Sequence, residues 1–191
     1  MPPGLGCASR LAEAFRAAPE GQTDAMRPYH YRFRSRWLLP AEPRRVYAVL
    51  ARPEEYPRWW PQVRTARAAP DGRSGSARIR SVLPYDLRVT IRELPGPSGA
   101  PGPDGVGVLR AAVDGDIRGE LGWRLSPRGA GTLAEFEQRV EVVTPLLRLL
   151  SLPGRPLLRL NHRLMMRAGQ RALRALLTRA DEGPRGRGEA V

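Results

Sequence analysis

Few side chains in this 191-residue sequence have the type and spacing that acid–base chemistry requires. Proton transfer needs a carboxylate or imidazole, and a developing anion needs a nearby donor. The candidates are Tyr85, Asp86, Arg110, Glu135, Glu137 and His162. The carboxylates most simply pair with surface arginines, and Arg110 alternates away from its apolar neighbours. His162 lies at the edge of the apolar arc of the last predicted helix, where a histidine more often has a structural hydrogen-bond partner than a role as a base. No catalytic residue is assigned from these patterns.

Cysteine and histidine are too scarce for most metal or nucleophile chemistry. Cys7 is the single cysteine, so an intrachain disulfide is impossible and a zinc site built from several cysteines is excluded. His30 and His162 are the only histidines. No Ser/His/Asp or Cys/His arrangement and no phosphate-binding loop can be assembled either. We therefore expect neither a metal ion nor another cofactor.

The formal charge of +13 suggests nucleic-acid binding until its composition is considered. All 32 basic residues are Arg, and the chain also contains 20 Gly and 20 Pro, a bias typical of a GC-rich genome. Residues 27–178 contain 27 Arg against 13 acidic residues, so the charge belongs to the folded part. The positive charge is spread over many segments, and few aromatic residues lie among the arginines. We therefore expect no nucleic-acid partner, and expect a basic surface or weak attraction to anionic membranes instead.

Hydrophobic periodicity predicts an α+β fold from residue 27 onward. From Tyr29 to Leu39 the odd positions are mostly apolar and the even positions mostly Arg, as in a half-buried strand. The predicted order is a strand over 29–39, helices over 43–50 and 54–60, strands over 62–69, 76–83, 85–94, 107–113, 117–125 and 132–143, and a helix over 154–178. The Pro- and Gly-rich residues 95–105 predict a loop between strands, because alternation resumes beyond them.

The two ends of the chain differ in composition from the predicted domain. Residues 1–26 suggest a disordered leader or a start codon placed too early, with Met26 as the alternative start, and residues 179–191 suggest a disordered tail. No run of 18 apolar residues is present, so a membrane span and a secretory signal are not expected. The cytoplasm is the expected location. The segment 146–159 is rich in leucine and arginine, and an interfacial membrane or partner contact there is an alternative.

The last helix contains the most informative pattern. On a helical wheel, one arc is apolar and the opposite side is arginine; the apolar members are Leu157, Leu164, Met165, Ala168, Ala172, Ala175 and Leu176. This arc is predicted to face the core. Asn161 projects from the same arc, where an amide is costly unless it has a hydrogen-bond partner. It indicates either a satisfied core amide or the wall of a cavity.

Several segments resemble the START-like, helix-grip superfamily (SRPBCC), in particular its polyketide cyclase/dehydrase branch. They are His30-Tyr-Arg-Phe-Arg-Ser-Arg-Trp37, Pro43-Arg-Arg-Val-Tyr-Ala-Val-Leu50, Pro53-Glu-Glu-Tyr-Pro-Arg-Trp-Trp-Pro61, Leu83-Pro-Tyr-Asp-Leu87, Gly119-Glu-Leu-Gly-Trp-Arg-Leu125 and Asn161-His-Arg-Leu-Met-Met-Arg167. The resemblance covers residues 27–178. It implies a seven-stranded curved antiparallel sheet around the long C-terminal helix, with two short helices after the first strand.

The resemblance also implies a deep cavity that binds an apolar or amphipathic small molecule, lipid-like or polyketide-like. Mapped onto this sequence, the expected lining is Phe33, Ser35, Trp37, Trp60, Leu87, Val89, Trp123, Asn161, Met165 and Ala168, and ordinary core packing is the alternative for each apolar member. Trp59 and Trp60 are interpreted as anchors of the short helices, or as a gate. Some branches of the superfamily cyclise or dehydrate polyketides, so an enzyme using the same cavity is a further alternative.

Overall fold

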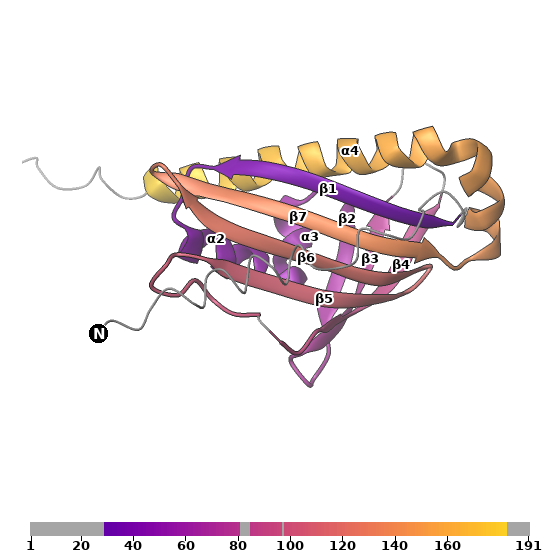
Figure 1. Ribbon diagram of the computed structural model, residues 1–191, viewed down its shortest axis with the longest axis horizontal. Helices are drawn as coiled ribbons and strands as arrows, with labels where there is room; N and C mark the ends of the chain where they lie inside the picture. The colour runs from indigo at the N-terminus through magenta and orange to yellow at the C-terminus, as the bar shows by residue number, and fades with distance from the viewer. Residues whose placement is uncertain (1–28, 81–84, 97, 183–191) are drawn as a thin grey trace, which may run out of the picture.

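The computed structural model describes residues 29–80, 85–96 and 98–182. Within these residues, seven strands and four helical segments follow one another (Figure 1). They are β1 (His30–Leu39), α2 (Pro43–Leu50), η2 (Pro53–Glu55), α3 (Tyr56–Trp59), β2 (Val63–Ala68), β3 (Ser74–Arg80), β4 (Asp86–Glu93), β5 (Gly107–Gly115), β6 (Ile117–Arg128), β7 (Gly131–Val142) and α4 (Pro145–Glu182). The predicted leader, residues 1–26, and residues 183–191 of the predicted tail lie outside the described residues.

The strands form one antiparallel sheet in the order β1-β7-β6-β5-β4-β3-β2. Each strand from β2 to β7 pairs with its neighbour in sequence, and β1 completes the sheet beside β7. Phe33 lies opposite Gln138 in the β1–β7 pair, and Trp123 lies opposite Phe136 in the β6–β7 pair. The α+β helix-grip fold expected from the sequence is confirmed, with a curved seven-stranded sheet and a long C-terminal helix.

The alternation in β1 explains how the sheet separates core from solvent. Tyr31, Trp37 and Leu39 are buried, whereas the arginines between them are exposed. A strand places successive side chains on opposite faces, so the odd positions enter the core as predicted. On the outer face, arginines of β1 pair with Glu135 and Glu137 of β7.

A glycine in β6 permits a close backbone approach to the next strand. Gly119 has a φ of 150°, and a Cβ atom at this position would collide with the carbonyl oxygen of Arg139 on β7. Glycine inside a strand commonly marks such an approach or a bend. A larger residue at position 119 would therefore push β6 and β7 apart beneath the cavity described below.

Helix α4 runs along β1 on one side of the sheet (Figure 1). It begins at Pro145 and ends at Glu182, and so extends beyond the predicted bounds 154–178 at both ends. The side chains of residues 146–155, within the segment that suggested an interfacial contact, lie outside the described part. No helix in the described part of the chain is long and apolar enough to span a bilayer.

The buried face of α4 is not the predicted one. The buried residues are His162, Met166, Gly169, Leu173 and Leu177, while Leu157, Leu164 and Leu176 of the predicted arc are 38 to 45% exposed. Leu160 is also exposed. The helix therefore has leucines on two sides, and the helical-wheel pattern predicted the wrong side as the buried one. The core is deepest where Leu173 and Leu177 meet the tryptophans Trp37, Trp60 and Trp123 in one buried cluster.

Candidate ligand-binding cavity

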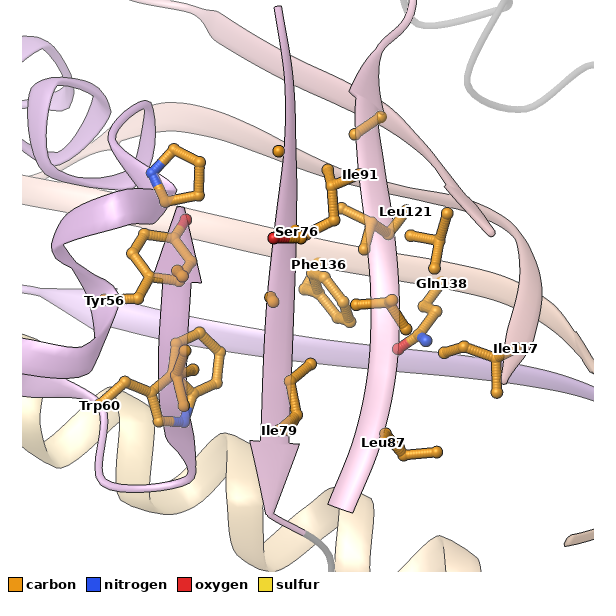
Figure 2. A pocket seen from close by; sticks show the side chains of 18 of the residues that line it. Tyr56, Trp60, Ser76, Ile79, Leu87, Ile91, Ile117, Leu121, Phe136 and Gln138 are labelled. Carbon is orange, nitrogen blue, oxygen red and sulfur yellow. The ribbon is translucent and has the colours of Figure 1, made fainter. Parts of the chain in front are cut away.

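A cavity of about 620 Å³ lies between the inner face of the sheet and the helices. Strands β1 to β7 contribute the sheet side, and α2, η2, α3 and α4 contribute the other side. Its wall is mainly apolar; the aromatic and larger aliphatic members include Tyr31, Phe33, Trp60, Ile79, Leu87, Val89, Ile91, Leu109, Val113, Leu121, Trp123, Phe136 and Met166 (Figure 2). A space of this size and character suits a small organic molecule.

Small side chains on β2 and β3 keep the cavity open. Ala66 on β2 lies opposite Ala77 on β3, and Ala68 lies opposite Gly75, with all four residues lining the cavity. Directly opposite residues share a face of an antiparallel sheet. Leucine or valine at these positions would occupy the space instead. The cavity therefore originates in a run of small residues on one half of the sheet.

His162 is the cavity residue with the most unusual environment. Its ring stacks on Phe33 with centroids 4.0 Å apart and an interplanar angle of 12°, and it lies 6.0 Å from the Phe136 ring. The residue is 8% exposed, and its Nε2 atom has no hydrogen-bond partner among the described residues. Burial lowers the pKa of His162 to about 4, because an imidazolium ion there would lose its hydration. The ring is therefore neutral at physiological pH.

Gln138 is the second buried polar side chain in the wall. It is 9% exposed on β7, opposite Phe33 on one side and Leu121 on the other. In Figure 2 its amide end points among Ile117, Leu87 and Leu121. The alternation of β7 had placed Gln138 on the inner face, but it was not selected as a site residue.

Trp60 holds the short helices against α4. Its indole Nε1 donates a hydrogen bond of 3.2 Å to the carbonyl oxygen of Met165, and its ring lies 5.4 Å from the ring of Trp59. Tyr56 donates a 2.7 Å hydrogen bond to the carbonyl oxygen of Leu50. Burial, and then the negative charge of Glu54, raise the pKa of Tyr56. These contacts support the interpretation of Trp60 as an anchor, and leave Tyr56 protonated.

The structure brings seven of the ten predicted site residues together around the cavity. They are Phe33, Trp60, Leu87, Val89, Trp123, Asn161 and Met165. Ser35, Trp37 and Ala168 do not line it. Trp37 is 1% exposed and packs between Trp60 and Trp123, with ring centroids 5.6 and 4.6 Å away, so it supports the wall from behind.

The candidate carboxylates lie away from the cavity. Glu135 pairs with Arg36 at 3.1 Å, Glu137 pairs with Arg32 at 2.8 Å, and Asp86 pairs with Arg78 at 3.1 Å. Their interpretation as surface ion-pair partners is confirmed.

Two further candidates also have structural partners. Arg110 is half-buried and pairs with Glu120 at 3.1 Å. Tyr85 donates a hydrogen bond to Asp116, and burial and this carboxylate raise its pKa. Among these candidates His162 departs from expectation. It was interpreted as a satisfied histidine at the edge of the apolar arc, and it is buried with an Nε2 atom that has no hydrogen-bond partner among the residues the structure describes. In the described part of the chain, no three His, Cys, Asp or Glu side chains are grouped so that they could hold a metal ion.

A curved antiparallel sheet, a long C-terminal helix and an apolar cavity between them define a START-like helix-grip protein. The family described as polyketide cyclase/dehydrase and lipid transport matches residues 39–168. Because this match spans more than half of the sequence, the chain belongs to that family, as the sequence motifs suggested. No curated protein sequence matches the chain significantly.

Solved structures resemble this fold at low sequence identity. The Zhui aromatase/cyclase from Streptomyces sp. R1128 superposes with a TM-score of 0.63 at 15% identity, over 83% of this chain and 99% of that one. A START superfamily protein from Mycobacterium smegmatis gives 0.58 at 14% identity, over 80% and 99%. A STAR-related lipid transfer protein from Xanthomonas axonopodis gives 0.51 at 17% identity, over 81% and 89%. At these identities the likeness concerns the fold.

Proposed function

We propose that this protein binds a hydrophobic or amphipathic small molecule, lipid-like or polyketide-like, in the cavity between the sheet and α4. The observation that supports the proposal is the cavity itself, about 620 Å³ with a mainly apolar wall. Protein interiors are otherwise close-packed, and an unfilled apolar space lowers the stability of the fold unless a bound molecule fills it. The family assignment agrees with this role, and the cytoplasm remains the expected location.

The ten residues selected from the sequence divide into two groups in this proposal. The seven that line the cavity are proposed to contact the ligand. Trp37 is proposed to act through Trp60 and Trp123, because it fixes both indoles from behind. Ser35 and Ala168 have no proposed contact.

A co-purification experiment tests the proposal. Native mass spectrometry of the full-length protein, followed by solvent extraction, should show a stoichiometric apolar molecule. Ala77→Phe, which fills the space left by a small residue on β3, should lose most of it. Ala112→Phe is the matched control, since Ala112 is half-buried on β5 but does not line the cavity.

If the protein is isolated empty, titration with a fluorescent apolar probe such as 1-anilinonaphthalene-8-sulfonate replaces extraction. Saturable binding that Ala77→Phe abolishes and Ala112→Phe preserves would support the proposal. Equal binding by all three proteins would place the probe elsewhere and contradict it.

The neutral, buried His162 favours a second candidate function, a cyclase/dehydratase that uses the same cavity. A base buried without a partner is the type of group that removes a proton from carbon next to a carbonyl. In a dehydration, the imidazole would take that proton and return a proton to the departing hydroxide, which leaves as water. Incubation with a polycyclic β-hydroxyketone should then show loss of one water by mass spectrometry. In His162→Phe the turnover should disappear while the substrate still binds.

A further inference from the structure

Helix α4 exposes leucine side chains on the side that faces away from the sheet. Leu157, Leu160 and Leu164 are 39, 49 and 45% exposed, whereas Met166 and Leu173 are buried on the side of the helix that packs on β1 and α3. At about 100° per residue the three leucines fall within an arc of about 60°, almost directly opposite the centre of the buried residues. In Figure 1 α4 lies along one edge of the molecule, with β1 on its inner side. Single exposed leucines are ordinary, but these three form a continuous apolar row, the leucine face.

A row of arginines runs beside the leucine face. Arg159, Arg163, Arg167 and Arg171 recur at every fourth residue, and all four are exposed. This spacing places them on successive turns, about 6 Å apart along the helix axis. In the part of the chain that the structure describes, the arginine ion pairs lie on the sheet and beside η2, and none involves this row. Residues 145–180 contain no Asp or Glu, so α4 supplies no acidic partner for the row from within this range.

The combination of leucines and arginines indicates what kind of surface would cover this side of α4. A second copy of the chain, docked through the same face, would bring two rows of positive charge together. A nucleic acid would pair with the arginines and leave the leucines in water. An anionic bilayer accommodates both, because an amphipathic helix lies in its surface with the apolar side chains about 5–10 Å deep and the arginine heads at the lipid phosphates. The formal charge of +13 adds attraction at longer range.

We propose that the outer side of α4 binds the surface of an anionic lipid bilayer. Leu157, Leu160 and Leu164 enter the boundary between headgroups and acyl chains, and the arginine row contacts the lipid phosphates. His162 and Met166, which line the cavity, are on the opposite side of the helix, so docking leaves the cavity wall in place. The membrane contact therefore stands or fails independently of the proposed ligand binding. An acidic protein partner is the competing occupant.

Vesicle flotation of the full-length protein tests the proposal. We expect it to bind vesicles of phosphatidylcholine and phosphatidylglycerol in equal parts, to bind phosphatidylcholine alone far more weakly, and to lose affinity steeply as salt is added. A leucine variant, Leu160→Gln/Leu164→Gln, should lower the partition coefficient on the anionic vesicles by about 10-fold. An arginine variant, Arg163→Gln/Arg167→Gln, should lower it by about 10- to 30-fold.

Matched controls remove the same side-chain types from the sheet. Leu38→Gln replaces a leucine on β1 that is 55% exposed. Arg88→Gln/Arg92→Gln removes the same charge from two exposed positions of β4, which alternate with residues lining the cavity and so lie on the outer face of the sheet. Both controls should change the partition coefficient by less than about 3-fold. All substituted side chains are exposed, so the melting temperatures should match that of the wild type and exclude unfolding as the cause of lost binding.

Four results would overturn the proposal. The first is no binding of the wild type to anionic vesicles at low salt, whatever covers the leucines. The second is an equal loss in the arginine variant and its β4 control, which would mean that binding follows net charge alone. The third is wild-type binding by the leucine variant, which would leave an acidic macromolecule as the occupant. The fourth is a dimer in size-exclusion chromatography that the leucine variant dissociates, which would assign this face to a second copy.

Discussion

The indole of Trp60 lies where a side chain at Gly169 would be. A Cβ atom on Gly169 would approach Cε2 of Trp60 to 2.5 Å and Nε1 to 2.9 Å. Helix α4 therefore needs a glycine at this turn, because the short helices dock through the same indole. The hydrogen bond from Trp60 to Met165, one turn earlier on α4, fixes the ring against this surface.

Gly169→Ala should destabilise the protein, although alanine favours a helix by about 1 kcal/mol over glycine. Overpacking against a ring held on both sides costs about 1–3 kcal/mol, so we expect a net loss measured by urea unfolding. The penalty should fall in a Trp60→Phe background, since the smaller ring leaves room. An equal penalty in both backgrounds would show that the helix backbone, and not the indole contact, is responsible.

His162 should make stability depend on pH. Its pKa is about 4 in the folded protein, against an ordinary value of 6.5. On acidification the imidazole therefore takes up a proton at a higher pH in the unfolded chain than in the folded protein. Stability is then full above about pH 6.5 and falls by about 1.4 kcal/mol per pH unit on acidification, levelling below about pH 4 at a total loss of about 3 kcal/mol.

Urea unfolding at pH 7.5 and pH 5 measures the effect of His162. His162→Phe, which keeps an aromatic ring on Phe33, should remove about 2 kcal/mol of the difference between these two pH values. His30→Gln is the control, because His30 is at the partly exposed start of β1 and its removal leaves His162 in place. An unchanged slope in His162→Phe would mean that the imidazole is accessible to protons in the folded state.

Thr132 should be sensitive to loss of its hydroxyl. It is 1% exposed, and its Oγ1 atom donates a 2.6 Å hydrogen bond to the carbonyl oxygen of Ala41, just before α2. Thr132→Val keeps the shape but leaves that buried carbonyl without its donor, at a cost of about 1–3 kcal/mol in chemical unfolding. Thr178→Val is the matched control, because its hydroxyl bonds an exposed carbonyl on α4, and we expect a change below about 0.5 kcal/mol.

Gln138 should be dispensable for stability even though it is buried. Gln138 lines the cavity, and if its amide has no structural partner, Gln138→Met should leave the melting temperature of the ligand-free protein unchanged or higher. Differential scanning calorimetry of the extracted protein provides the comparison, with Gln170→Met as the matched control, because Gln170 is half-buried on α4 and does not line the cavity. A loss of about 2 kcal/mol or more would show that the amide has a structural partner such as bound water.

Much of the fold could be predicted from local sequence patterns. Which polar residues line the cavity could not, because that depends on how distant segments pack together. The period-two pattern of β1 correctly predicted which side of the strand is buried, because a strand has only two faces. Helix α4 has leucines around most of its circumference, so the wheel could not decide between Leu164 and Met166. That choice depends on how α4 packs on β1 and Trp60, which the helix sequence alone does not contain.

His162 illustrates the same limit for the site. His162 lies at the edge of the apolar arc on the helical wheel, which predicted a boundary residue, and only the rotation of α4 about its axis places it against Phe33. Gln138 was correctly placed on the inner face by alternation, but alternation does not distinguish a satisfied glutamine from one that lines a cavity. The small residues Ala66 and Ala77 were equally uninformative until their strands were paired.

The pairing of β1 with β7 also has a consequence for how fast the protein becomes competent to bind. Phe33 and Gln138 are 105 residues apart in sequence, yet they are partners across these two strands. Such non-local contacts slow folding, since the long intervening chain must be closed before they form. A ligand can therefore recognise only the finished native state, and at 100 times its dissociation constant it would add about 2.7 kcal/mol to the folded side of the equilibrium. Occupancy would extend the lifetime of the folded protein without hastening its formation.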